Sequence, residues 1–167
     1  MVEGEKRGRL GGKSSNPYHE GKKYPEPTQC PQCQLIYHNG RWQHGDLSET
    51  AQHKIHASHC PACRRELDRL PSGLLLLQGS YFEKHRDEIL NIAKNQSEAA
   101  AAHRPLQRIM WIEQDGNATE IATTDSHLAT RIGKAIEGAC KGELTIKHAS
   151  DAQLVRVYWE RQDTPDA

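Results

Sequence analysis

Two short stretches, Cys30-Pro31-Gln32-Cys33 and Cys60-Pro61-Ala62-Cys63, decide the fold of the first half of this 167-residue chain. Each stretch holds two cysteines with two residues between them, and residues 34–59 separate the stretches. This spacing lets both thiolates of a pair reach one ion from a single tight turn, so two pairs complete a tetrahedral shell. The sequence therefore predicts one structural metal site formed by Cys30, Cys33, Cys60 and Cys63.

Zinc is the metal that such a four-cysteine pattern favours, and an iron–sulfur cluster is the alternative. A disulfide framework needs an oxidising compartment, and a thioredoxin-like redox role needs one cysteine pair on a βαβ frame, so both are disfavoured. Four thiolates leave no open coordination position, and we expect the ion to be structural and not catalytic. The fifth cysteine, Cys140, is predicted to be a small core residue.

Composition limits how large a core this chain can bury. Hydrophobic residues make up 35% of the sequence and the mean hydropathy is −0.83. The 22 basic residues equal the 22 acidic ones, so attraction to a polyanion must come from local clusters of bases. Apolar runs such as Leu74 to Leu77 are too short for a membrane span, and the glycine-rich start does not resemble a secretion signal. We therefore expect a cytoplasmic protein that has no contact with membranes.

The pattern along the chain predicts an α+β protein in five parts. Residues 1–28 form a flexible basic and polar arm, and residues 29–78 form the zinc module, with a hairpin around Asn39-Gly40 and a strand at Gly73 to Gln78. Residues 79–105 form a connecting helix that begins at a capping box of Ser80 and Glu83. Residues 106–162 form a small α+β domain, and residues 163–167 are a tail.

The small domain is predicted to have the order β-β-α-β-β, with one helix packed on an antiparallel sheet. Its helix is capped by Thr124 or Asp125 and ends at Lys141-Gly142. Apolar residues recur on one side of this helix at the spacing of a buried stripe: Leu128, Ile132, Ala135, Ile136 and Ala139.

A second stripe on the same helix is basic. It follows the steps i, i+4, i+7, i+11 and i+14, and consists of His127, Arg131, Lys134, Gly138 and Lys141. Such a face can lie along a phosphate backbone, although an ordinary solvated face has the same pattern. Further candidate RNA contacts are Arg41 and Trp42 in the hairpin, Arg64 and Arg65 after the second cysteine pair, and Lys22 and Lys23 in the arm.

No catalytic constellation is apparent in the sequence. We find no nucleophile with a base and an orienting group, no glycine-rich phosphate loop and no acid pair at a recognisable spacing. The chain is therefore expected not to be an enzyme and to have no small-molecule substrate.

Several motifs together resemble a known family. They are Asn16-Pro17-Tyr18, the two cysteine pairs, Gly40-Arg41-Trp42, and Thr123-Thr124-Asp125 followed by His127-Leu128-Ala129. They resemble the short bacterial NMD-type zinc proteins, whose zinc half is similar to that of the archaeal and eukaryotic adaptor of the large ribosomal subunit. Gln34 departs from this pattern, because glycine is more usual after the second cysteine.

The resemblance implies a ribosome-associated factor that binds rRNA, more specifically that of the large subunit, and that acts on idle or stressed ribosomes. Two other functions remain open at this point. One is a zinc-ribbon DNA-binding transcriptional regulator, and the other is an adaptor that docks a partner protein on the ribosome.

Overall fold

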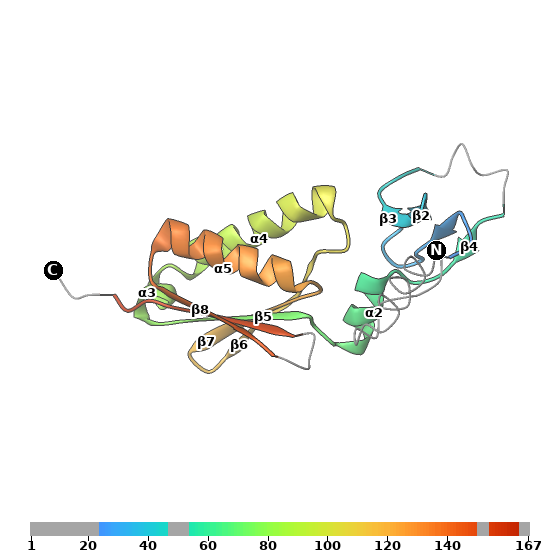
Figure 1. The fold of residues 1–167 in the computed structure, drawn as a ribbon. Coiled ribbons are helices and arrows are strands. Elements are labelled where there is room, and N and C mark those ends of the chain that lie inside the picture. Colours follow the sequence, from blue (N-terminus) through green and yellow to red (C-terminus); the bar gives the residue numbers. More distant parts are fainter. Residues whose placement is uncertain (1–23, 47–53, 150–153, 164–167) are drawn as a thin grey trace, which may run out of the picture. The chain divides into compact units, whose positions relative to one another are not determined.

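The computed structural model describes residues 24–46, 54–149 and 154–163 (Figure 1). The chain divides into two compact units, Met1–Leu67 and Asp68–Ala167. In the described residues these units contain two small sheets and four helices, so the predicted α+β class is confirmed. None of the helices in this part of the chain combines the length and the apolar character that crossing a membrane requires.

Unit 1 contains a four-stranded sheet in the order β3-β2-β1-β4. The strands are β1 (Thr28–Gln29), β2 (Ile36–His38), β3 (Arg41–Gln43) and β4 (His56–Ala57), and helix α2 (Pro61–Asp68) follows them. β2 and β3 form the predicted hairpin, with His38 opposite Arg41. Asn39 and Gly40 both have positive φ, of 54° and 80°, as a two-residue hairpin turn requires.

Three aromatic rings form the centre of unit 1. Tyr37 and Trp42 are each only 7% exposed, and with Tyr24 they make edge-to-face contacts between ring centroids at 5.0 to 5.5 Å. The guanidinium of Arg64 donates a hydrogen bond to the Tyr24 hydroxyl at 3.1 Å, which ties α2 to this cluster. A small unit with few aliphatic residues thus obtains its packing from aromatic contacts.

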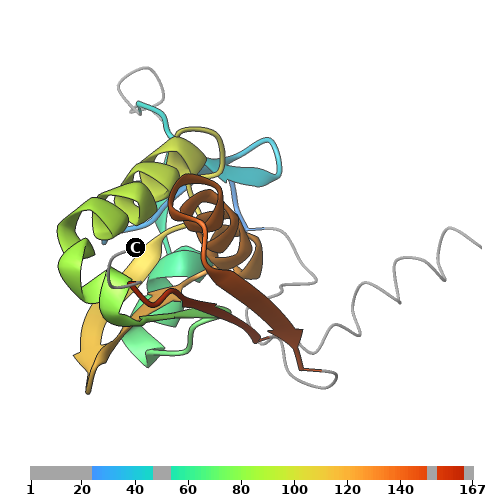
Figure 2. The same cartoon turned by 90° about the vertical axis from the view of Figure 1, so that its left-hand side faces the viewer.

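Unit 2 contains a five-stranded sheet in the order β6-β7-β5-β9-β8. In chain order its elements are β5 (Gly73–Gln78), α3 (Ser80–Lys84), α4 (Arg86–His103), β6 (Ile109–Asp115), β7 (Ala118–Thr123), α5 (Ser126–Cys140), β8 (Glu143–His148) and β9 (Val155–Glu160). The β5–β9 pair is parallel and the other pairs are antiparallel. The long helices α4 and α5 lie on the same face of the sheet (Figures 1 and 2).

The predicted boundary between the zinc module and the second domain is wrong for Gly73–Gln78. This segment is β5, the central strand of the second sheet, where Leu75 and Leu77 are fully buried. A Cβ added at Gly73 would lie 2.6 Å from both the Cβ of Ala129 and the Oγ1 of Thr123, so glycine allows α5 to approach the sheet closely. With these two leucines β5 supplies buried apolar side chains that the predicted strands and single helix of the second domain would lack.

The predicted connecting helix is instead part of unit 2. It is divided into α3 and α4 at His85, and Phe82, Ile89 and Ala93 are fully buried in the core of the unit. Within residues 106–162 the predicted order β-β-α-β-β is confirmed, and the complete order of unit 2 is β-α-α-β-β-α-β-β because β5, α3 and α4 come before it. These helices are amphipathic because one side of each covers the sheet. A helix that connects two domains can have the same sequence pattern, so the pattern alone does not distinguish the two arrangements.

The predicted capping box of Ser80 and Glu83 is also wrong. Ser80 lies inside α3, where its side chain makes no capping bond. Its hydroxyl donates to the Gln162 Oε1 at 3.1 Å and accepts from the Asp163 N–H at 2.6 Å. A hydrogen bond from the Lys84 ammonium holds the pKa of Asp163 below its usual value. These contacts fasten the segment after β9 to α3.

Helix α5 follows the prediction closely. The Asp125 carboxylate caps it by accepting from the N–H groups of His127 at 2.8 Å and Leu128 at 3.3 Å, and the helix ends at Cys140 before Lys141-Gly142. The predicted stripe of Leu128, Ile132 and Ile136 is fully buried. Ala139 is exposed, whereas Cys140 is 2% exposed and is the predicted core residue.

Candidate metal centre

The first cysteine pair lies in a closed turn directly after β1. The Cys30 N–H donates to the Leu35 carbonyl at 2.9 Å, and the Gln34 N–H donates to the Cys30 carbonyl at 2.9 Å. Gln34 has a φ of +70°, in the left-handed region that favours glycine. The turn geometry typical of such pairs is therefore present, with a glutamine where glycine is more usual.

The second cysteine pair is built differently, on the first turn of α2. Pro61 is the first residue of the helix. A backbone N–H at this position has no partner within the helix, so proline, which has no N–H, costs no hydrogen bond there. The Cys60 sulfur accepts a hydrogen bond from the Cys63 N–H at 3.4 Å, and the Arg64 N–H donates to the Cys60 carbonyl at 3.0 Å. Arg64 is thus helical, and no glycine is needed after Cys63.

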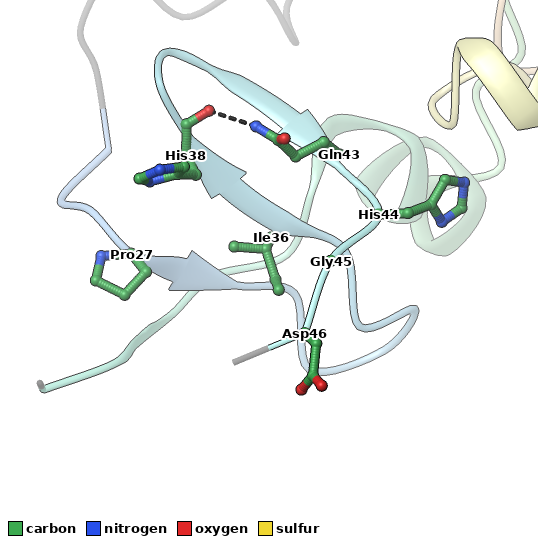
Figure 3. Close-up of a pocket in the computed structure, with 7 residues that line it drawn as sticks. All are labelled: Pro27, Ile36, His38, Gln43, His44, Gly45 and Asp46. Carbon is green, nitrogen blue, oxygen red and sulfur yellow. Dashed lines mark hydrogen bonds between the residues drawn. The ribbon is translucent and has the colours of Figure 1, made fainter. Parts of the chain in front are cut away.

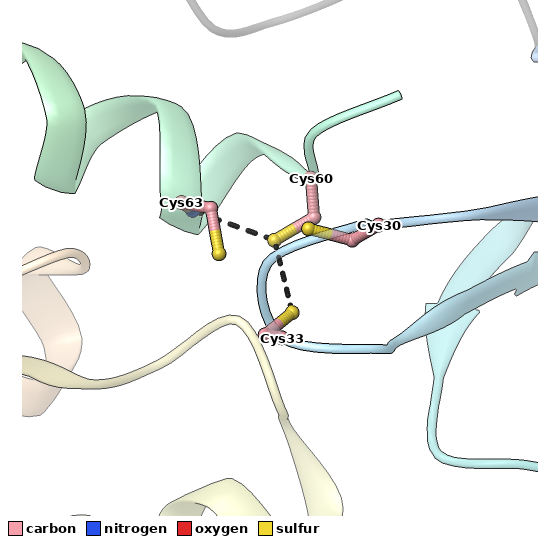
Figure 4. A group of neighbouring side chains, drawn as sticks. All are labelled: Cys30, Cys33, Cys60 and Cys63. Carbon is pink, nitrogen blue, oxygen red and sulfur yellow. Dashed lines mark hydrogen bonds between the residues drawn. The ribbon is translucent and has the colours of Figure 1, made fainter. Parts of the chain in front are cut away.

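These two turns bring the four predicted sulfurs together, each within 4.8 Å of the others (Figure 4). The Cys33 and Cys60 sulfurs are 3.7 Å apart, far beyond the roughly 2.05 Å of a disulfide bond, and none of the four cysteines forms a disulfide. Cys30, Cys60 and Cys63 have no exposed surface, and Cys33 is half-buried. The arrangement is consistent with one structural metal site.

Local electrostatics favour thiolates at this centre. Burial raises the pKa of the Cys30 thiol, but hydrogen bonds from the backbone of Cys33, Cys60 and Gln32 outweigh it and lower the pKa to about 6. Cys60 and Cys63 lie at the N-terminus of α2, where the helix dipole stabilises negative charge. Four converging thiolates can bind a soft or borderline cation, and such a shell leaves no position for a substrate.

The basic stripe of α5 is on the surface, as predicted. His127, Arg131, Lys134, Gly138 and Lys141 are all exposed. The Arg131 guanidinium donates to the Gln96 Oε1 of α4 at 3.0 Å, which fixes its direction. The His127 Nδ1 lies 3.4 Å from the capping Asp125 carboxylate.

Several other predicted RNA contacts are placed differently. Trp42 and Arg65 are each 7% exposed, so their side chains offer almost no surface to a ligand. Arg64 is half-buried against Tyr24, whereas Arg41 is exposed at the start of β3. Lys22 and Lys23 lie outside the described residues. Of these residues, Arg41 alone presents an exposed base in the part of the chain that the structure describes.

A small pocket lies beside the hairpin of unit 1 (Figure 3). It has a volume of about 110 Å³ and is lined by Pro27, Ile36, His38, Gln43, His44, Gly45 and Asp46. Ligand sites for small molecules typically measure about 300 to 1,000 Å³, so this pocket is too small for one. Among the described residues, the four cysteines are the one group of three or more potential metal ligands that converge.

The sequence reasoning missed the role of Tyr24, which supports the site through Trp42 and Arg64. An aromatic residue next to a proline, six positions before the first cysteine, is the signal that could have indicated it. The Tyr24 ring packs only after distant segments fold together, so no periodic pattern in the sequence indicates its role.

Fold and site together define an α+β protein with four converging cysteines, consistent with one structural metal site, and an exposed basic helix. Comparisons with protein-family models, with curated proteins and with solved structures each gave no match to this chain.

Proposed function

We propose that the protein is a zinc-stabilised, ribosome-associated factor that binds rRNA. Zinc is the proposed metal, and the sulfur positions support it. Zn–S bonds of about 2.3 Å place the corners of a tetrahedron about 3.8 Å apart, close to the Cys33–Cys60 separation of 3.7 Å. An iron–sulfur cluster distributes its cysteines over two or more irons, which spreads the sulfurs more widely than the 4.8 Å found here. The ion holds the first cysteine turn against α2.

The observation that carries the RNA proposal is the exposed basic face of α5. Its buried stripe packs against the sheet, so the bases project on the solvent side of a helix whose position is fixed. From His127 to Gly138 the stripe extends over about 17 Å at 1.5 Å per residue, enough to contact several phosphates. Lys141 follows at the C-terminal end of the helix, with a φ of +59°. Gly138 has no atom within 4 Å of a Cβ position and leaves the backbone open to close approach.

The ribosome is proposed from the motif resemblance, and the large subunit is the proposed location. Idle or stressed ribosomes are the proposed target, and the protein is proposed to act in the cytoplasm as a binding factor and not as an enzyme. Arg41 on the hairpin of unit 1 is the second proposed contact, since it is exposed on a rigid turn. Trp42 and Arg65 are assigned to the packing of unit 1 and not to RNA.

The proposal is tested with the full zinc-loaded chain and purified ribosomal subunits. Co-sedimentation at increasing salt should give a log–log slope that falls by about 1 for each phosphate contact removed. The triple variant Arg131→Gln, Lys134→Gln, Lys141→Gln should weaken binding to the large subunit and reduce that slope by about 2 to 3.

The matched control is Lys94→Gln. Lys94 is an exposed base on α4, two residues before Gln96 and therefore about 200° around the helix from the contact with Arg131. This variant should bind like the wild type. A wild-type protein that stays unbound even at low salt, or that prefers duplex DNA to rRNA at matched salt, would contradict the proposal. So would an association that persists in nuclease-treated lysate, because it would indicate a protein partner.

A further inference from the structure

The sheet of unit 2 has a second face that none of the helices α3, α4 and α5 covers (Figure 1). Side chains alternate along each strand, and those next to the buried Leu75, Leu77 and Val157 point to this open face. On the central strand β5 they include Leu74 and Leu76, both half-buried. An apolar centre therefore remains on a sheet that already has a complete core on its other side.

The register of the strands shows how this centre is built. Leu76 lies opposite Tyr158 of β9, and Tyr158 lies opposite Thr145 of β8. A hollow of about 150 Å³ is lined by Leu74, Leu76, Arg156 and Tyr158 among its residues. The row from Leu76 to Thr145 is uncharged and lies across the middle of the β5-β9-β8 half of the sheet.

Charges of opposite sign lie at the two ends of this half. At one end Lys147 and Arg156 are paired across β8 and β9, and at the other end Glu143 and Glu160 are paired across the same strands. All four side chains are exposed. Arg156 and Glu160 are four positions apart, which is about 13 Å along the strand.

We propose that this open face is the interface of a homodimer, in which it packs on the same face of a second copy. A two-fold axis that lies between the sheets and across the strands reverses the strand direction. It brings Lys147 and Arg156 of one copy over the Glu143 and Glu160 ends of the other, and it places Tyr158 near its own copy. Such an interface is isologous, since one patch is complementary to itself.

The acidic residues near β6 place the centre of the interface on the β5-β9-β8 half. Glu113 is held by Arg69 at 3.1 Å, and Glu120 accepts from the Trp111 ring nitrogen at 3.0 Å. Arg69 also lies over the Trp111 ring at 4.1 Å. Glu120 lies opposite Leu76, so an interface centred on β6 and β7 would bring the Glu120 carboxylates of the two copies together, and their repulsion favours the β5-β9-β8 half of the sheet.

The size of the face sets the expected affinity. The three strands of the β5-β9-β8 half, at about 4.8 Å each, and six residues at about 3.3 Å give about 14 by 20 Å, or about 600 Å² for two copies, and the whole five-stranded face gives about 1,000 Å². Only the larger area reaches the lower limit of specific interfaces, so we expect a weak dimer with a dissociation constant in the upper micromolar range.

The test is sedimentation equilibrium of the full zinc-loaded, nuclease-treated chain from about 1 to 200 µM. The wild type should pass from monomer to dimer in this range. Reversing the basic end (Lys147→Glu, Arg156→Glu) or the acidic end (Glu143→Lys, Glu160→Lys) should each raise the dissociation constant at least about tenfold. The variant with all four substitutions should dimerise again, because the ends are exchanged and remain complementary.

A loss of folding cannot produce this pattern, since the quadruple variant contains every substitution of the two double variants. The triple α5 variant described above provides the control and should dimerise like the wild type. The proposal is overturned by a wild-type monomer at all concentrations, by double variants that dimerise normally, or by a quadruple variant that remains monomeric. It is equally overturned if the double variants lose RNA binding while self-association is unchanged, since the face would then be an RNA surface.

Discussion

Gln34 has a backbone φ of +70°, a conformation that costs a residue with a side chain about 1 to 2 kcal/mol. Its side-chain amide donates to the Pro31 carbonyl at 3.3 Å, on the surface, which offsets little of this cost. Arg64 holds the corresponding place after the second cysteine pair, but there the chain is helical. Residues at equivalent sequence positions therefore have opposite backbone requirements.

We predict that Gln34→Gly stabilises unit 1 and that Arg64→Gly destabilises it. The first change removes the strain at positive φ, and the greater chain entropy of glycine reduces the gain to about 0.5 to 1 kcal/mol. The second places glycine in α2 at a cost of about 1 kcal/mol, to which the loss of the hydrogen bond to Tyr24 adds. Urea denaturation of the zinc-loaded variants, followed by the NMR signals of the hairpin residues of unit 1, measures both. Equal effects of the two changes would contradict the assigned turn geometries.

At the scale of the element, α5 has two surfaces that differ in how well they tolerate an added side chain. A Cβ at Gly133 would lie 2.7 Å from the Val157 Cγ1 and 3.0 Å from the Leu144 Cδ1, whereas nothing lies within 4 Å at Gly138. Glycine therefore serves close packing at Gly133, and packing does not require it at Gly138.

The same substitution should consequently have opposite effects at these two positions. We expect Gly138→Ala to stabilise unit 2 by about 0.5 to 1 kcal/mol through helix propensity. Gly133→Ala should destabilise it by about 1 to 2 kcal/mol, because overpacking against β9 outweighs that gain. Thermal denaturation of the two variants provides the comparison. A stabilising Gly133→Ala would show that α5 can move away from the sheet without loss.

At the scale of the whole molecule, the two units depend on different sources of stability. Unit 2 has a continuous core that extends from Leu75 on β5 to Trp159 on β9. The described part of unit 1 has short strands, three aromatic rings and the four cysteines. Zinc binding in small metal-dependent modules contributes about 10 to 16 kcal/mol, more than such a core provides alone.

Removal of the metal should therefore unfold unit 1 and leave unit 2 folded. A strong chelator should abolish hydrogen-exchange protection in the hairpin of unit 1, while β5 and β9 stay protected. Cys33→Ser should have the same effect, and Cys140→Ala, which removes a buried cysteine of unit 2, should leave the metal content unchanged. Loss of protection in both units, or in neither, would contradict this division.

Features that depend on neighbouring residues could be predicted from the sequence, and features that depend on distant residues could not. The cysteine pairs, the hairpin at Asn39-Gly40 and the Asp125 cap were predictable, because each depends on neighbouring residues and on local backbone chemistry. The buried stripe of α5 was predictable in the same way from its period. The position of Trp42 was not, since its burial depends on Tyr24 and on the distant α2.

The sequence by itself determined the four converging cysteines, most of the elements and the exposed basic face of α5, because spacing and periodicity encode them locally. The tertiary structure alone decided that β5 is the centre of the second sheet, that α3 and α4 cover it, and that the helices in the described part of unit 2 leave the opposite face uncovered. Strand order depends on pairings between residues as far apart as Leu77 and Trp159. No local pattern in either strand specifies its partner, so the neighbour of each strand is set only when the whole unit packs.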